Sequence, residues 1–203
     1  MPWSVYNSNG KLLQSLAIAD DSIVEGKLDV SNAPTNGYFL QAQSGEGGGL
    51  TWAAATSSFI GVRVENSSHQ SINNNSSTNI TFDASVTKFD TDTMHSSSNA
   101  DRITFTTAGK YYVAISYAWN GATGGRRNVS CHRYNSSNSN QGTVHRQTIS
   151  PATNDELHNG FSFIYDFNAG DYVVFPGHQT SGSALLLLAD GENSAVAMAY
   201  KID

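Results

Sequence analysis

The sequence has one cysteine, few charged residues and no long apolar run, and each shortage excludes a class of protein. Cys131 is the only cysteine in 203 residues, so the chain cannot form an internal disulfide. Only 14% of the residues are charged and the net charge is −6, which argues against binding to nucleic acid or to an anionic membrane surface. No window approaches the roughly 18 consecutive apolar residues of a transmembrane helix, so no membrane insertion is expected.

The amino terminus does not have the pattern of an export signal. Residues 1–6, MPWSVY, lack a basic segment followed by an apolar run. We therefore expect a protein that is made in a cytoplasm and leaves it, if at all, by lysis or within an assembled particle.

Ser, Asn, Thr and Gly provide the polarity that charged residues do not. These residues favour turns and sheet edges and disfavour helix interiors, so the composition predicts an all-β chain. The clearest strand spans residues 108–119, where large apolar side chains occupy every second position. We expect one buried face on a central strand, made of Tyr111, Val113, Ile115, Tyr117 and Trp119.

Short alternating runs continue from residue 59 to the carboxyl terminus. There are about ten of them at spacings of about 8 to 15 residues, which is typical of an antiparallel sandwich. The polar residues 66–79 are compatible with a surface loop and with a very short edge strand. We therefore expect one domain over residues 59–203.

Residues 1–58 have a different composition. Residues 11–18 are compatible with a short strand and with a helical turn. Apolar residues after them are too sparse for a private core, so we expect them to be buried only between copies of the chain. The main candidates for this stem contact are Leu28, Val30, Leu40, Leu50 and Trp52, with Ile23 and Phe39 beside them.

The segment from Asn32 to Trp52 resembles a repeat of bacteriophage tail and virion fibres. The pattern Asn-x-Pro-Thr-x-Gly-x-x-Leu, a Gly-rich gap and Leu-Thr-Trp is carried by Asn32, Pro34, Thr35, Gly37, Leu40, Leu50, Thr51 and Trp52. In such fibres three chains wrap into a slender β-rich shaft. The resemblance implies a trimeric stem over residues 1–58 that ends in a hinge at residues 53–58, and the alternative is a flexible Gly/Ser linker.

Three stretches of the second domain resemble the complement-C1q and tumour-necrosis-factor (TNF) superfamily. They are residues 99–113, with Ala-Gly-Lys-Tyr before the central strand, residues 164–173, with Ala-Gly-Asp-Tyr-Val, and the strand that ends at Asp203. We expect the second stretch to form a hairpin that turns at Gly170-Asp171. The resemblance implies a trimeric jelly roll, although residues 195–199 replace the usual Phe-Gly-containing last strand.

No pattern predicts catalysis or a cofactor. The chain has no Gly-x-Ser-x-Gly sequence, and its six histidines show no metal-ligand spacing, although His132 and His145 are expected on adjacent strands. Asp90 and Asp92 are weak calcium candidates because two carboxylates follow a strand. The alternative, which we favour, is a turn capped by Asp.

Four arginines lie in a window from residue 126 to residue 146 that contains no Asp or Glu. Guanidinium groups bind phosphate and carboxylate groups, so Arg126, Arg127, Arg133 and Arg146 are candidates for contact with an anionic cell-surface glycan or lipopolysaccharide phosphate. Salt bridges between subunits are the alternative. Tyr134, beside the polar loop 135–142, is the candidate for stacking on a sugar, whereas Tyr117 and Trp119 are expected in the core.

The sequence as a whole predicts a non-catalytic, homotrimeric virion fibre protein of a bacteriophage. We expect residues 1–58 to attach to other virion proteins and the C-terminal knob to bind a host-surface glycan or protein. Two alternatives remain: a capsid or tail decoration fibre with a purely structural role, and a secreted or spore-surface jelly roll of a bacterium.

Overall fold

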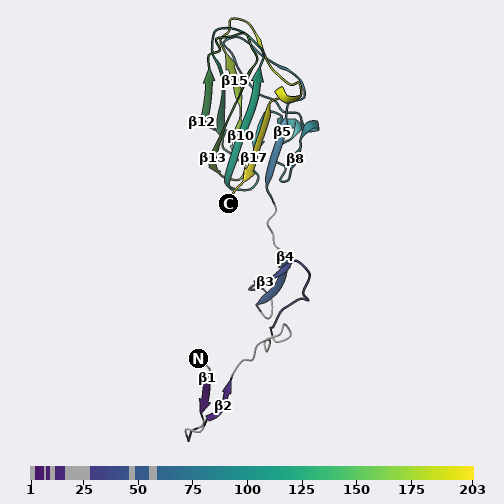
Figure 1. The fold of residues 1–203 in the computed structure, drawn as a ribbon, viewed down its shortest axis with the longest axis vertical. Coiled ribbons are helices and arrows are strands. Elements are labelled where there is room, and N and C mark those ends of the chain that lie inside the picture. Colours follow the sequence, from purple (N-terminus) through teal and green to yellow (C-terminus); the bar gives the residue numbers. More distant parts are fainter. Residues whose placement is uncertain (1–2, 7, 10–11, 17–27, 46–48, 55–58) are drawn as a thin grey trace. The chain divides into compact units, whose positions relative to one another are not determined.

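The computed structural model describes residues 3–6, 8–9, 12–16, 28–45, 49–54 and 59–203 (Figure 1). The chain divides into two units, residues 1–58 and residues 59–203. Ile23 and the last part of the expected hinge, residues 55–58, lie outside the described residues.

The C-terminal domain, residues 59–203, consists of two antiparallel sheets. The seven strands of sheet A are β13 (Leu157–Phe167), β10 (Gly109–Trp119), β17 (Val196–Lys201), β5 (Gly61–Glu65), β8 (Phe89–Asp90), β16 (Leu185–Leu187) and β6 (Gln70–Ile72). The six strands of sheet B are β12 (Asn140–Ile149), β11 (Arg127–Tyr134), β14 (Tyr172–Val174), β9 (Arg102–Thr104), β15 (Pro176–Gln179) and β7 (Ser77–Asn79). The loops contain the short 3₁₀ helices η2 (Ala84–Val86), η3 (Ser97–Asn99) and η4 (Gly191–Asn193). An all-β antiparallel sandwich is confirmed.

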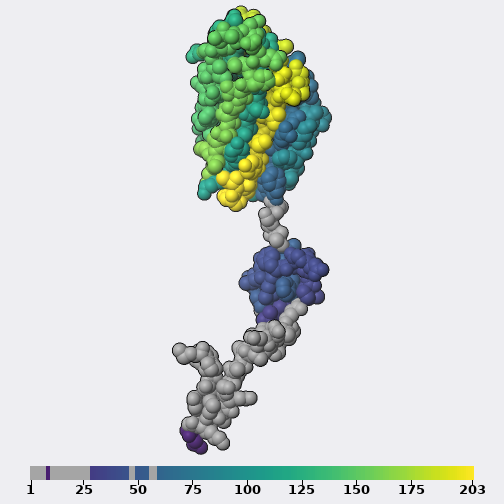
Figure 2. All heavy atoms as spheres, in the orientation of Figure 1, coloured from purple at the N-terminus to yellow at the C-terminus, as the bar shows by residue number. Residues whose placement is uncertain are grey.

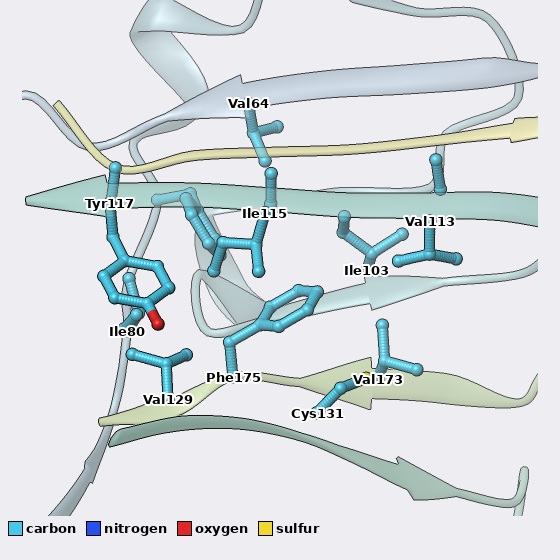
Figure 3. Packing of buried hydrophobic residues seen from close by; sticks show 14 of the residues in the cluster. Val64, Ile80, Ile103, Val113, Ile115, Tyr117, Val129, Cys131, Val173 and Phe175 are labelled. Atoms are coloured by element: carbon cyan, nitrogen blue, oxygen red, sulfur yellow. The ribbon is translucent and has the colours of Figure 1, made fainter. Parts of the chain in front are cut away.

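Strand β10 is central, as its alternation predicts. It pairs with β13 along one side and with β17 and β16 along the other. Every second side chain from Tyr111 to Trp119 is buried, which confirms that Tyr117 and Trp119 belong to the core. Figure 3 shows Val113, Ile115 and Tyr117 facing the side chains of sheet B. Removing each large apolar side chain from water contributes about 1.5–3 kcal/mol.

The turn at Gly170-Asp171 is not a hairpin, and the sequence prediction is wrong on this point. The strand before it, β13, pairs with β10 in sheet A, whereas the strand after it, β14, pairs with β11 and β9 in sheet B. A Gly-Asp turn shows where a strand ends, but the next strand can pair back or cross to the other sheet. Here the chain crosses between the sheets.

A second crossing, between β9 and β10, lies beside the first. The main-chain N–H of Phe105 donates to the carbonyl of Asp171 at 2.8 Å, and the N–H of Gly170 donates to the carbonyl of Phe105 at 2.8 Å. The rings of Phe105 and Phe167 stack with centroids 3.7 Å apart. The two sequence stretches that resemble the C1q and TNF jelly rolls thus hold each other together.

Several expected strands differ in extent. Residues 80–82 form no strand, although Ile80 and Phe82 are buried. Of residues 84–90, the first three form η2 and only the last two form a strand, β8. Residues 66–79 contain β6 and β7, and β15 begins at Pro176.

Residues 1–58 contain two hairpins. Strand β1 (Trp3–Tyr6) pairs with β2 (Leu12–Leu16), so the ambiguous region after residue 11 forms a strand. Strand β3 (Tyr38–Ala42) pairs with β4 (Leu50–Ala54), and Val30 forms a parallel bridge to Leu50.

The second hairpin leaves apolar surface uncovered in a single copy. Three consecutive large side chains of β3 are exposed: Tyr38 at 42%, Phe39 at 46% and Leu40 at 37%. The other expected contact residues, Leu28, Val30, Leu50 and Trp52, are half-buried.

Candidate ligand-binding groove

A polar groove of about 290 Å³ lies on the face of sheet B that points away from the core. Val129 and Cys131 of β11 belong to the core, so the residues that alternate with them face outward. Four strands and the residue before β11 contribute to the lining. The lining residues are Ser77, Arg126, Asn128, Ser130, His132, Arg146, Thr148, Pro176 and His178; this surface is called the sheet B groove below.

The strand register places hydrogen-bonding side chains in a row across the groove. Asn128 of β11 is paired with Thr148 of β12 and with His178 of β15, and His178 is paired with Ser77 of β7. The amide of Asn128 lies 3.5 Å from Nδ1 of His178. Two hydroxyls, an amide and an imidazole therefore point outward at one level of the sheet.

Two of the four arginines from the acid-free window meet in this groove. Nε of Arg146 donates to Oγ of Ser130 at 3.1 Å, and Arg126 lines the same groove. None of the described residues that line the groove is an Asp or a Glu. Burial, followed by the positive charge of Arg146, lowers the pKa of His132, so this imidazole is neutral near neutral pH.

Arg127 faces the opposite way and does not belong to the groove. Its side chain is only 2% exposed, and its guanidinium donates to the carbonyls of Gly124 at 2.6 Å and Ala122 at 2.8 Å. The sequence contains a signal for this, because Arg127 shares the alternation of Val129 and Cys131. The role of Arg127 is to hold the loop before β11.

Arg133 shares the inward alternation of Arg127 and also lies outside the groove. Its guanidinium lies 5.3 Å from the ring centroid of Tyr165 in sheet A and donates to the Tyr165 hydroxyl at 3.1 Å. This contact links β11 to β13 and leaves Arg126 and Arg146 as the groove arginines.

Tyr134 lies on the outer face of sheet B but does not line the groove. Its ring stacks on Tyr172 with centroids 5.0 Å apart, and its hydroxyl accepts a hydrogen bond from Asn140 at 3.2 Å. Arg102 lies 4.2 Å from the ring centroid of Tyr172. The result is an aromatic platform on the same face as the groove.

The carboxylates of the calcium candidates accept hydrogen bonds from neighbouring groups of the domain. The carboxylate of Asp90 accepts the main-chain N–H groups of Met94 and His95, each at 2.9 Å. The carboxylate of Asp92 accepts the hydroxyl of Thr106. Within the described residues, no group of three His, Cys, Asp or Glu is placed to hold a metal ion. His132 and His145 lie on the adjacent strands β11 and β12, but on opposite faces.

The outer face of sheet A carries a group of aromatic rings, beside the charged side chains of Arg63 and Glu65. The ring of Tyr200 lies 5.1 Å from Tyr112 and 6.2 Å from Phe59, and Phe59 lies 5.5 Å from Phe89. Ile164 of β13 is 62% exposed. Figure 2 shows this face, with β17 in yellow between β10 and β5.

Solved structures resemble the chain in fold. Murine APRIL, in a crystal structure at pH 5.0, matches with a TM-score of 0.55 and 10% identity over 71% of this chain and 100% of that chain. Eiger TNF from S. frugiperda matches with a TM-score of 0.53 and 13% identity over 71% and 93%. The globular domain of zebrafish complement 1qA matches with a TM-score of 0.50 and 13% identity over 71% and 98%.

The chain contains a TNF/C1q-like jelly roll. At these identities the likeness shows the fold alone. No family model and no curated protein matches the sequence. Among the described residues, no helix of this jelly-roll protein is long and apolar enough to cross a membrane.

Proposed function

We propose that this chain is a homotrimeric fibre protein of a bacteriophage virion whose jelly-roll domain binds the host-cell surface without catalysis. The observation that carries the binding role is the sheet B groove, where Arg126 and Arg146 face outward in a lining without carboxylates. The fibre role is supported by the resemblance of residues 32–52 to a phage-fibre repeat. Residues 1–58 would attach the protein to other virion components.

Association of three copies would cover apolar surface that one copy leaves exposed. Such surface occurs on β3, at Tyr38, Phe39 and Leu40, and on the outer face of sheet A, around Tyr112 and Tyr200. Large exposed apolar surfaces are typical of interaction sites. Threefold association is also what the resemblance to the C1q and TNF superfamily implies.

Three grooves on one particle would bind a repetitive cell surface together. The second and third contacts become intramolecular once the first has formed, so the avidity can exceed the single-site affinity by a factor of about 10² to 10⁴. Weak individual contacts therefore suffice for adsorption.

Two measurements on the purified full-length chain test this proposal. Light scattering should give a mass of about three times the chain mass of 21.7 kDa. The protein should also reduce the adsorption of virions to host cells when it is added in excess. A mass of one chain in native buffer would overturn the trimer, and unchanged adsorption at saturating protein would overturn the receptor-binding role.

A purely structural decoration fibre is the second candidate. The apolar side chains on the outer face of sheet A support it, because association of copies alone explains their exposure. In this case virions that lack the protein would adsorb normally but would lose infectivity at a lower temperature than complete virions.

A further inference from the structure

We propose that the sheet B groove binds the phosphate group of a phosphorylated surface polysaccharide. This inference rests on the proposed host-binding function and names the chemistry of the ligand. It is carried by the charges, the donor geometry and the hydrogen-bonding row of the groove.

Neither groove arginine has a carboxylate partner among the described residues, in contrast to four other cations of the domain. Arg63, Lys88, Arg102 and Lys201 lie 2.9 Å, 3.5 Å, 3.7 Å and 2.8 Å from carboxylate oxygens. No ion pair within the described residues includes Arg126 or Arg146. On a chain with a net charge of −6, two uncompensated guanidinium groups in one groove create a local site for an anion.

Each groove arginine is anchored in a way that leaves donors available. Among the described residues, the Arg146 side chain forms a hydrogen bond only through Nε, to Ser130, so its two terminal nitrogens remain for a ligand. The main chain of Arg126 is fixed by Thr180, whose Oγ1 accepts from the Arg126 N–H at 2.9 Å and whose N–H donates to the Arg126 carbonyl at 3.0 Å. Two guanidinium groups on fixed backbone need less reorganisation to form charge-assisted hydrogen bonds.

The donors favour a tetrahedral oxyanion over a carboxylate. A planar carboxylate is satisfied by one guanidinium fork, whereas a phosphate presents three oxygens that accept bonds from several directions. The groove offers two guanidinium groups from different positions, and the imidazoles of His132 and His178 lie beside them. Nε2 of His132 is shielded from solvent and has no hydrogen-bond partner within the described residues.

The surroundings favour a phosphorylated sugar over a free ion. Thr148, Asn128 and Ser77 continue the polar row across the sheet, and such groups form hydrogen bonds with sugar hydroxyls. The stacked pair Tyr134–Tyr172 on the same face adds an apolar platform.

Salt bridges between copies are a poorer explanation for these arginines. The apolar side chains on the outer face of sheet A, around Tyr112, Tyr200 and Ile164, suit packing between copies. The sheet B groove is polar, which suits a hydrated ligand.

The inference is tested by calorimetry on the full-length protein. The ligands are a polysaccharide that carries phosphate monoester groups, the same polymer after phosphatase treatment, a sulfated polysaccharide, and inorganic phosphate as competitor. We expect binding to the phosphorylated polymer, loss of binding after dephosphorylation, and competition by inorganic phosphate. Equal binding of the dephosphorylated or the sulfated polymer would overturn the assignment of phosphate.

Variants of single cations localise the site. Arg126→Gln and Arg146→Gln should each weaken binding of the phosphorylated polymer about tenfold or more, because a charge-assisted bond is lost. The matched control is Lys88→Gln, which removes one positive charge outside the groove and should change affinity less than about twofold. Unchanged affinity in both arginine variants would overturn the site.

Two further readouts separate this inference from the proposed function. If the protein still competes with virions after both arginines are replaced, and phosphate does not affect this competition, the host-binding role stands and the assignment of a phosphate ligand is wrong. If the protein binds the phosphorylated polymer through the arginines but does not compete with virions, the phosphate ligand stands and the host-binding role is wrong. A fall in mass of the arginine variants to one chain would show that these residues bridge copies, which also overturns the inference.

Discussion

The side-chain amide of Asn32 pairs with the main chain of Trp52 as a neighbouring strand would. Nδ2 of Asn32 donates to the Trp52 carbonyl at 2.8 Å, and the Trp52 N–H donates to Oδ1 of Asn32 at 2.7 Å. The hydroxyl of Thr51 donates to the same Oδ1 at 3.0 Å. Three residues of the fibre-like repeat are thus bonded across a separation of about twenty positions, which gives their spacing a physical reason.

We expect Asn32→Ala to loosen the β3–β4 hairpin. The substitution removes both hydrogen bonds to Trp52 at a partly solvated site. The free energy of opening the hairpin should therefore fall by about 1 kcal/mol. Hydrogen exchange at the Trp52 amide should become about five times faster. The control is Asn36→Ala, on an exposed residue of the same segment. Unchanged exchange at Trp52 would show that the amide pairing does not stabilise this hairpin.

Adjacent arginines should differ sharply in their effect on stability. Arg127→Met removes the charge-assisted bonds to the carbonyls of Ala122 and Gly124 and should lower the free energy of unfolding by about 2–3 kcal/mol. Arg126→Met changes an exposed side chain and should change the free energy of unfolding by less than about 0.5 kcal/mol. Urea unfolding at one fixed protein concentration measures both. Equal effects would contradict the buried role of Arg127.

The thiol of Cys131 should report on unfolding. The side chain is fully buried in the core, and burial raises the pKa of the thiol well above its usual value. A thiol reagent at pH 8 should therefore label the folded protein at least about 100-fold more slowly than the protein in denaturant. Because Cys131 is the only cysteine, the signal has one source. Fast labelling in native buffer would mean that the sandwich opens near β11.

Stability should fall at alkaline pH through two core tyrosines. Burial, with the charges of Asp92 and Asp203, raises the pKa of Tyr111 to about 12, and burial also raises the pKa of Tyr117. In the unfolded chain these groups ionise near pH 10. Their contribution is therefore present below about pH 10 and is lost as the pH rises toward 12, because only the unfolded state releases the protons there.

Tyrosinate absorbance tests this pH dependence. Two of the nine tyrosines should ionise only together with unfolding. Tyr111→Phe should remove part of the alkaline loss and, through the missing bond to the Thr107 carbonyl, cost about 1 kcal/mol at pH 7. Ionisation of all nine before unfolding would contradict the burial of these side chains.

Alternation predicted the central strand because a side-chain period of two is a property of the backbone itself. The same rule, applied to β11, places Arg126 and Asn128 on the face of the sheet opposite to Arg127. It does not separate a hairpin from a crossing, since the turn at Gly170-Asp171 has the same local chemistry in both. Phe105 stacks on Phe167 where the chain crosses between the sheets, and no pattern near either residue in the sequence predicts this contact.

The groove itself depends on contacts that are distant in sequence. Arg126 and Arg146 carried a signal, because a run of arginines without carboxylates stands out in an acidic chain. Ser77 and His178 carried none, because β7 and β15 are short strands of three and four residues among polar and Pro-Gly sequence. Their place beside Asn128 follows from pairing between strands.

The sequence alone determined that this protein is a β sandwich with one apolar strand at its centre, because burial and pleating act on each strand locally. Only the tertiary structure decided which strands cross between the sheets and which arginines point outward together. Both features depend on hydrogen bonding between strands that are distant in the sequence, because the edge of a strand can pair with a strand from any part of the chain.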